Sequence, residues 1–357
     1  MIERDFKVDL LKTIAVLCVI TIHVTSYGWS LFTAGTFPWV ANMFWASATR
    51  AAVPIFLMCS GAIFLDPRRE LPIKKLYVRY LPRVVAAMLV WAMAYKVVHL
   101  ISGGAFSGAG LLQALKETLV FNQEFHLYYI HIIIFVYICL PVLRLITANA
   151  SKRQLEYCLA LWFVFGILYP TVGGFRPLTL ITGFPRQWML NMTLAAMGYL
   201  VLGHYIRYVS ALRRRHYLAI LAAGFLFVFF GTWIMCVRRG QFYEGFLGGM
   251  SVGVALMAAG IFGVCPEKAR RKSAGPDDCR GVSGGFPGAA VTYCSKASFC
   301  VYLAHVFFMR FFERIGFAVG SFAPILSAPL VTLAIFICSG AVYAVMSRIP
   351  IVKEWLV

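Results

Sequence analysis

The chain has 357 residues, of which 61% are hydrophobic and 13% charged. Water-soluble globules average roughly 45–50% apolar and about 25% charged residues, so this composition excludes a soluble globular protein, and with it a disordered or coiled-coil one. The chain has a net charge of +19. Such an excess is expected of a membrane protein, because Lys and Arg accumulate in its cytoplasmic loops. No basic helix or RNA-binding aromatic motif accompanies that charge, so nucleic acid is not an expected partner.

Apolar runs bounded by charged residues predict an all-α, polytopic transmembrane helix bundle of about ten spans. The expected spans are residues 8–28, 39–65, 84–101, 126–147, 155–172, 188–206, 217–237, 243–265, 297–319 and 324–347. With the N-terminus in the cytoplasm, the inner segments hold 23 Lys and Arg residues and the outer segments hold 7. This asymmetry favours an even number of crossings with both termini in the cytoplasm.

The whole chain, residues 1–357, is expected to form a single integral-membrane domain. Its longest polar segment, residues 266–296, is rich in Gly, Pro and charge and is interpreted as a flexible cytoplasmic loop. Most of the ten cysteines lie in apolar runs, and those in or beside this loop lack CxxC spacing. Neither a zinc site nor a disulfide framework is therefore predicted.

The first span carries three ionisable residues, Asp9, Lys12 and His23. Charges inside its apolar stretch and the lack of a cleavage site after it favour an uncleaved helix over a signal peptide. On an α-helix, Lys12 and His23 lie about 20° from the same face and about 16 Å apart along the axis. This spacing excludes direct contact and suits a passage with groups at two depths.

Two interpretations are open for each of these residues. Lys12 either extends to the membrane surface or binds an anionic donor from the cytoplasm. His23 either packs against a neighbouring helix or acts as the general base for an acceptor hydroxyl, since neutral imidazole suits base catalysis at neutral pH.

Arg50 is a cation far from either end of the second span. Pro54 frees the backbone carbonyl of Arg50, and Gly61 allows a close helix contact. A broken helix beside an intramembrane cation usually lines a cavity, so Arg50 is a candidate ligand for an anionic cofactor.

A basic segment leads into the third span. For Arg68 and Arg69 the favoured role is anchoring at the cytoplasmic surface and attraction to anionic lipid. Arg79 and Arg83 are four residues apart, which predicts one shared helix face. Two guanidinium groups there are suited to bind the phosphates of a cytoplasmic cofactor.

The fourth span opens with Glu124, His126 and His131. Their spacing lacks the i, i+4 histidine pair of a zinc helix, so no metal is predicted, and Glu124 or His126 is interpreted as an acceptor-binding or proton-handling group. In the ninth span, Tyr302 and His305 are three residues apart and share a face, so one is expected to orient the other.

Several of these segments, taken in order along the chain, resemble acyltransferase family 3, the integral-membrane O-acyltransferases of bacterial surface glycans. The matching residues are 9–23, 53–61, 79–83, 126–130, 197–200 and 298–305. No fused extracytoplasmic esterase-like region is evident, so the resemblance is to the stand-alone type, such as the enterobacterial common antigen O-acetyltransferase.

The resemblance implies a basic residue and a catalytic His separated by ten residues, which Lys12 and His23 satisfy. It also implies an arginine pair at the third helix. The family spaces this pair as RxxR, whereas Arg79 and Arg83 are RxxxR, and Tyr128 stands where the family commonly has Trp. Which arginine has the family role is therefore open.

The sequence thus predicts an O-acetyltransferase of the bacterial inner membrane that takes acetyl-CoA as donor and a cell-surface or lipid-linked glycan as acceptor. The residues expected to be catalytic are His23, Lys12, Glu124 and His305, and those expected to bind the donor are Arg79, Arg83, Arg50 and Lys12. No permanently bound cofactor is expected, and membrane lipid is a partner. The alternative is a transporter or flippase of a lipid-linked sugar or polysaccharide, since intramembrane charges and broken helices also serve transport.

Overall fold

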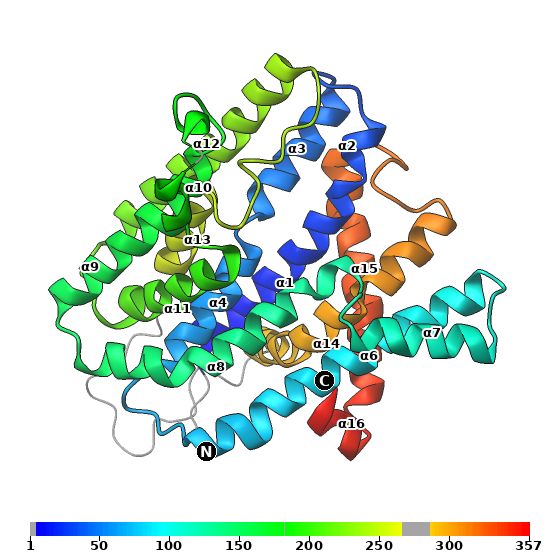
Figure 1. Cartoon of the computed structure of the whole chain (residues 1–357). Coiled ribbons are helices and arrows are strands. Elements are labelled where there is room, and N and C mark those ends of the chain that lie inside the picture. Colours follow the sequence, from blue (N-terminus) through cyan, green and yellow to red (C-terminus); the bar gives the residue numbers. More distant parts are fainter. Residues whose placement is uncertain (1–4, 182, 266–285) are drawn as a thin grey trace.

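The computed structural model describes residues 5–181, 183–265 and 286–357 (Figure 1). Across these ranges the secondary structure is helical and contains no strand. The elements are α1 (Phe6–Ser26), α2 (Gly28–Leu31), α3 (Phe37–Thr49), α4 (Ala52–Phe64), α5 (Ile73–Lys75), η1 (Leu76–Tyr80), α6 (Leu81–Ser102), α7 (Gly108–Leu119), η2 (Phe125–Leu127), α8 (Tyr128–Asn149), α9 (Lys152–Trp162), η3 (Phe163–Leu168), α10 (Tyr169–Val172), η4 (Leu178–Leu180), η5 (Phe184–Trp188), α11 (Met192–Tyr208), α12 (Arg214–Arg239), α13 (Val252–Val264), α14 (Phe286–Arg314), α15 (Pro324–Met346) and α16 (Pro350–Trp355).

Within the described ranges, seven helical segments are long and apolar enough to cross a membrane. They are residues 6–31, 37–64, 73–102, 125–149, 152–172, 214–239 and 324–346. Helices α11, α13 and α14 occupy the other three ranges in which the sequence predicts a span. The predicted all-α, polytopic bundle is therefore confirmed.

Two boundaries differ from the sequence prediction. Helix α13 has 13 residues and is about 20 Å long, shorter than the expected span 243–265, because turns with several glycines precede it. Helix α14 begins at Phe286, so the prediction of a loop was wrong for residues 286–296. Packing against α1 extends this helix, since the Thr13 hydroxyl donates to the carbonyl oxygen of Val291 at 3.3 Å. The rest of the predicted loop, residues 266–285, lies outside the described residues.

Helix α1 lies at the centre of the bundle, where it contacts α3, α4, α14 and α15 (Figure 1). Its buried Asp9 accepts a hydrogen bond from the Ser295 hydroxyl at 2.7 Å, which ties α1 to α14. Helices α4 and α11 approach closely because Gly61 faces the backbone of Leu200 and Gly203 faces the backbone of Met58. The close contact predicted at Gly61 is confirmed.

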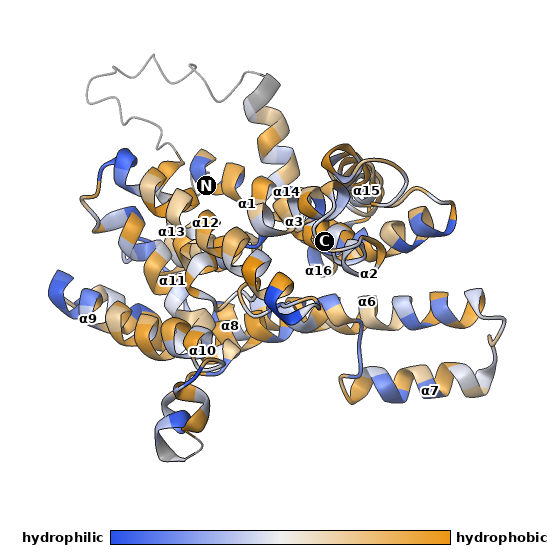
Figure 2. Ribbon diagram, turned by 90° about the horizontal axis from the view of Figure 1, so that it is seen from above, coloured by the Kyte–Doolittle hydropathy of each residue, from blue (hydrophilic) through white to orange (hydrophobic). Residues whose placement is uncertain are grey.

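The second span is broken, as its proline predicts. Helix α3 ends at Thr49, and α4 begins at Ala52 with Pro54 in its first turn. Arg50 lies in this break, half-buried. Figure 2 shows that apolar residues dominate the flanks of the helices and that α6 and α7 extend to one side of the bundle as a hairpin.

Candidate active site

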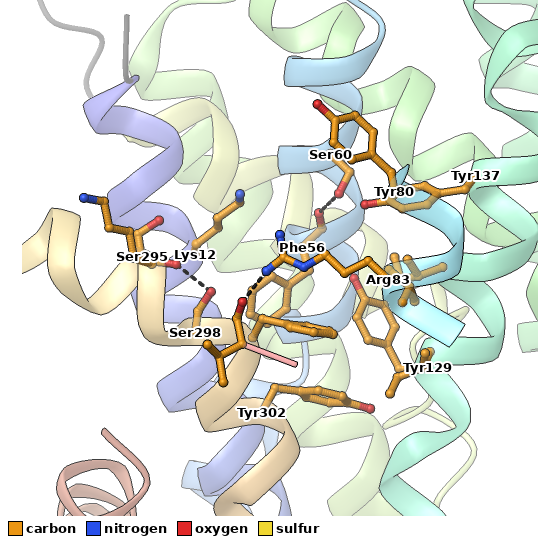
Figure 3. Close-up of a pocket in the computed structure, with 16 residues that line it drawn as sticks. Lys12, Phe56, Ser60, Tyr80, Arg83, Tyr129, Tyr137, Ser295, Ser298 and Tyr302 are labelled. Atoms are coloured by element: carbon orange, nitrogen blue, oxygen red, sulfur yellow. Dashed lines mark hydrogen bonds between the residues drawn. The ribbon is translucent and has the colours of Figure 1, made fainter. Parts of the chain in front are cut away.

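A cavity of about 380 Å³ opens between α1, α4, α6, α8 and α14, and we call it the Lys12 cavity (Figure 3). It is lined by Lys12, Phe56, Ser60, Tyr80, Arg83, Val84, Tyr129, Ile130, Ile133, Tyr137, Ser295, Lys296, Ser298, Phe299, Tyr302 and Val357. Lys12 belongs to the first half of α1, and Val357 follows the last helix, so the two ends of the described chain meet at one side of the bundle. This arrangement agrees with an even number of crossings.

The Lys12 cavity is cationic. Lys12, Arg83 and Lys296 line it, and none of the described side chains in its wall is a carboxylate. Figure 3 shows the side chains of Lys12 and Arg83 extending toward one another from α1 and α6. A cavity with several cations and hydroxyl groups is suited to an anionic ligand, because charge-assisted hydrogen bonds to phosphate are about twice as strong as neutral ones.

The two arginines at the third helix have different surroundings. Arg83 lines the Lys12 cavity and donates to the backbone oxygen of Val357. Arg79 lies outside that cavity and forms an ion pair with Glu354 at 2.9 Å, with 63% of its side chain exposed. Residues 76–80 form a π-helical segment, whose wider turn changes the angular spacing on which the shared α-helical face was predicted.

Three histidines from distant segments meet on the far side of this cavity's wall, and we call them the histidine cluster. The rings of His23 and His305 are stacked with centroids 5.1 Å apart. His126, at the 3₁₀ turn η2, lies edge-on to His305 at 5.1 Å. The sequence named each histidine separately but could not predict that the three meet.

His305 has a defined tautomer in this geometry. Its Nδ1 lies 2.6 Å from the carbonyl oxygen of Tyr302, and a carbonyl oxygen only accepts, so Nδ1 carries the proton and Nε2 keeps a free lone pair. Within the described part of the chain, Nε2 of His305 and both ring nitrogens of His126 are buried without a hydrogen-bond partner. Buried unpaired nitrogens are unusual and point to groups used by a ligand or a reaction.

Tyr302 and His305 lie together, with ring centroids 6.0 Å apart, but the hydrogen bond between them comes from the Tyr302 backbone and not from its side chain. The Tyr302 carbonyl accepts from His305, while its hydroxyl donates to the carbonyl of His126. The Tyr95 ring lies edge-on to His126 at 5.0 Å, and its hydroxyl donates to the Leu303 carbonyl at 2.8 Å. These contacts connect η2, α6 and α14 around the imidazoles.

Glu124 is held in an ion pair that the sequence analysis missed. Arg310 donates to both carboxylate oxygens, at 3.2 and 2.8 Å, and His99 lies 3.5 Å from the same carboxylate. Only 11% of the Glu124 side chain is exposed. The signal in the sequence was an arginine five residues after His305, inside an apolar run.

Arg50 lies near the histidine cluster and not in the wall of the Lys12 cavity. Arg50 is among the cations that act on His23, and Glu244 is the carboxylate that acts on Arg50. Its Nε is buried and has no hydrogen-bond partner among the described residues. The structure therefore brings Arg50 toward the candidate base, and Lys12 and Arg83 toward each other.

The Lys12 cavity does not extend to His23. Tyr129 and Tyr302 line the cavity, and the Tyr302 ring lies 6.0 Å from both His126 and His305. Lys12 and His23 nevertheless share a face of α1, as predicted, because Lys12 meets the Ser295 end of α14 and His23 meets His305 farther along it. The predicted continuous passage is thus interrupted by two tyrosines.

No group of three or more His, Cys, Asp or Glu in the described ranges has the arrangement of a metal site. His131 is separate from the histidine cluster and packs edge-on against Phe121 at 5.4 Å. At the surface, Arg68 is engaged by Asp66 at 2.9 Å, so this arginine has a partner within the loop in addition to any lipid.

The arrangement of a helical membrane bundle, a cationic cavity and adjacent buried imidazoles defines a membrane protein equipped to handle an anionic substrate and protons. The model of acyltransferase family 3, described as an acyltransferase domain, matches residues 5–344. The chain therefore belongs to this family and is a multi-pass membrane acyltransferase. Comparisons with curated proteins and with solved structures gave no match.

Proposed function

We propose that this acyltransferase transfers an acetyl group from cytoplasmic acetyl-CoA to a hydroxyl of a cell-surface or lipid-linked glycan in the bacterial inner membrane. The observation that carries the proposal is the Lys12 cavity, which has three cations and no acidic side chain among its described lining residues. CoA carries phosphate groups, and guanidinium and ammonium groups are the side chains that bind phosphate. The wall of this cavity that contains Tyr302 adjoins the histidine cluster.

In the proposed reaction, His23 removes the proton from the glycan hydroxyl. The oxygen attacks the thioester carbonyl, the C–S bond breaks, and the CoA sulfur leaves as a thiolate that takes up a proton. The His23 imidazolium supplies that proton to the thiolate, with the free Nε2 of the stacked His305 as the relay. Lys12 and Arg83 hold the donor, and Arg50 stabilises negative charge near His23.

The role proposed for Glu124 is to bind the glycan acceptor. It is held by Arg310 on α14 and lies two residues before His126. A paired carboxylate and guanidinium there offer both acceptors and donors to sugar hydroxyl groups. The acyl arm must pass Tyr129 and Tyr302 to reach the histidine cluster, so these side chains move during the proposed cycle.

The direct test is transfer of radiolabelled acetyl from acetyl-CoA to glycan in proteoliposomes that contain the full chain. His23→Ala is expected to abolish transfer. The exposed His216 supplies the matched control, since His216→Ala removes an imidazole that does not line the Lys12 cavity and should leave transfer unchanged. Transfer at the wild-type rate by His23→Ala would refute the assigned base.

Thermal stability in detergent separates the acyltransferase proposal from transport of a lipid-linked sugar. A ligand that binds only the folded state raises apparent stability, by about 2.7 kcal/mol at 100 times its Kd. CoA is expected to stabilise the protein. Stabilisation by a lipid-linked sugar but not by CoA would contradict the proposed donor.

A further inference from the structure

A second cavity of about 370 Å³ adjoins the Lys12 cavity, and we call it the α16 cavity. It is lined by Arg79, Tyr80, Arg83, Pro350, Lys353, Glu354 and Trp355. Tyr80 and Arg83 line both cavities, so a single extended ligand can occupy the two at once. The family match ends at residue 344, so α16 lies outside it.

Helix α16 is held in place against α6. The Trp91 indole donates to the carbonyl of Leu356 at 3.4 Å, and Arg83 donates to the backbone oxygen of Val357. Arg79 pairs with Glu354 at 2.9 Å. These contacts fix the position of Lys353 relative to the two arginines.

The α16 cavity combines positive charge with an aromatic surface. Three cations face one carboxylate, and that carboxylate is already paired with Arg79. Trp355 is 40% exposed, which leaves part of its indole free to contact a ligand. A nucleobase can stack its flat face on such an indole ring, while a phosphate group binds to the cations.

We propose that the α16 cavity binds the 3′-phosphoadenosine end of the CoA donor. Lys353 and Arg79 bind the 3′-phosphate, Trp355 lies against the adenine, and Arg83 binds the diphosphate where the two cavities meet. The Lys12 cavity then holds the pantetheine arm and its acyl group. This inference rests on the proposed function, because it assumes CoA as the donor.

The test compares CoA with 3′-dephospho-CoA, which differ only in the phosphate assigned to Lys353 and Arg79. Binding to the purified full chain in neutral detergent is measured by titration calorimetry. The wild type is expected to bind CoA more than tenfold more tightly than 3′-dephospho-CoA, because the 3′-phosphate makes charge-assisted contacts with two cations, each worth about tenfold. Equal affinities would overturn the assignment of the 3′-phosphate.

Lys353→Ala is expected to weaken CoA binding about tenfold and to leave binding of 3′-dephospho-CoA unchanged. The matched control is Arg348→Ala, which removes an exposed cation that lines neither cavity. Trp355→Ala should weaken both ligands equally, because adenine is common to them. A Lys353→Ala variant that loses affinity for both ligands equally, or for neither, would contradict the proposal.

Glu354→Gln is expected to change CoA affinity in the opposite direction. It removes the carboxylate that competes with phosphate for Arg79, so it is expected to strengthen CoA binding several-fold. Weaker CoA binding in this variant would count against the site.

Two further outcomes distinguish this inference from a wrong donor and from lipid binding at the same cations. If the wild type binds neither CoA nor 3′-dephospho-CoA, the proposed donor is wrong and the α16 site falls with it. If Lys353→Ala reduces retention of phosphatidylglycerol, measured by native mass spectrometry, but leaves CoA binding intact, these cations bind lipid headgroups and the nucleotide assignment is overturned.

Discussion

The Lys12 cavity and the histidine cluster carry different kinds of polar group. The cavity has permanent cations in the first halves of α1, α6 and α14, whereas the cluster has imidazoles buried among aromatic rings. Burying a permanent charge costs far more than burying a neutral polar group. The comparison teaches that the cavity gathers its cations toward one side of the bundle, whereas the imidazoles of the cluster can be neutral and still exchange a proton, with Arg50 as the permanent cation near them.

The largest expected effect comes from the histidine cluster. His305→Ala removes the free Nε2 beside His23, and turnover is expected to fall by about 10²–10⁴-fold. CoA binding should stay unchanged, because His305 lines neither donor cavity. Steady-state transfer and calorimetry on the same preparation measure the two quantities. A variant that loses CoA affinity and keeps its turnover would reverse the roles assigned to the two regions.

The next effect comes from the Lys12 cavity. Lys12→Ala or Arg83→Ala removes a charge-assisted contact worth about 1.5–3 kcal/mol, so the Kd for CoA should rise by about 10–100-fold. The rate at saturating donor should change much less. Lys296→Ala tests whether the third lining cation adds to the first two. An unchanged Kd in both Lys12→Ala and Arg83→Ala would show that the cavity does not hold the donor.

Arg310→Ala is expected to act on stability. It leaves the largely buried carboxylate of Glu124 without its bidentate partner, and the free energy of unfolding should fall by about 1–3 kcal/mol. Arg310→Ala combined with Glu124→Gln should recover part of that loss, because the neutral amide is less costly to leave unpaired. Thermal denaturation of the two single variants and the double variant measures this coupling.

The smallest effect concerns the loop that leads to Arg83. Burial raises the pKa of Asp66, but hydrogen bonds from Arg68 outweigh it and hold that pKa below its usual value of 3.8. A carboxyl with a lowered folded pKa stabilises the fold above its unfolded pKa, and this contribution is lost as pH falls toward the folded value. Asp66→Asn should therefore lower thermal stability at neutral pH and show less acid dependence below pH 4 or so. Melting temperatures of the wild type and of Asp66→Asn that fall in parallel as the pH is lowered would contradict this expectation.

Most of the fold could be predicted from the sequence. Apolar runs and the placement of Lys and Arg predicted the helices, and Pro54 predicted the break beside Arg50. The start of α14 at Phe286 could not be predicted, because Pro287 and Gly288 follow a Gly-rich, charged stretch of sequence and indicate a loop. This segment contacts Thr13 and Asp9 of α1 as a helix. Local composition does not report such contacts between segments far apart in the chain.

The candidate site was predicted in part. The face shared by Lys12 and His23 follows from helical periodicity alone. The pairing of Arg310 with Glu124 and the tyrosines that interrupt the passage have no local signature, since each depends on how α8 and α14 pack. The π-helical segment at residues 76–80 also separated Arg79 from the Lys12 cavity, although α-helical spacing placed it beside Arg83.

The sequence by itself determined that this protein is a helical membrane bundle, which ionisable residues lie within it, and which family it belongs to. These properties follow from composition, periodicity and local motifs, which are encoded in short stretches of chain. The tertiary structure alone decided that His23, His126 and His305 meet, and that α16 adds a second cavity to the first. Contacts between residues 100 or more positions apart arise from the packing of whole helices, which no short stretch specifies.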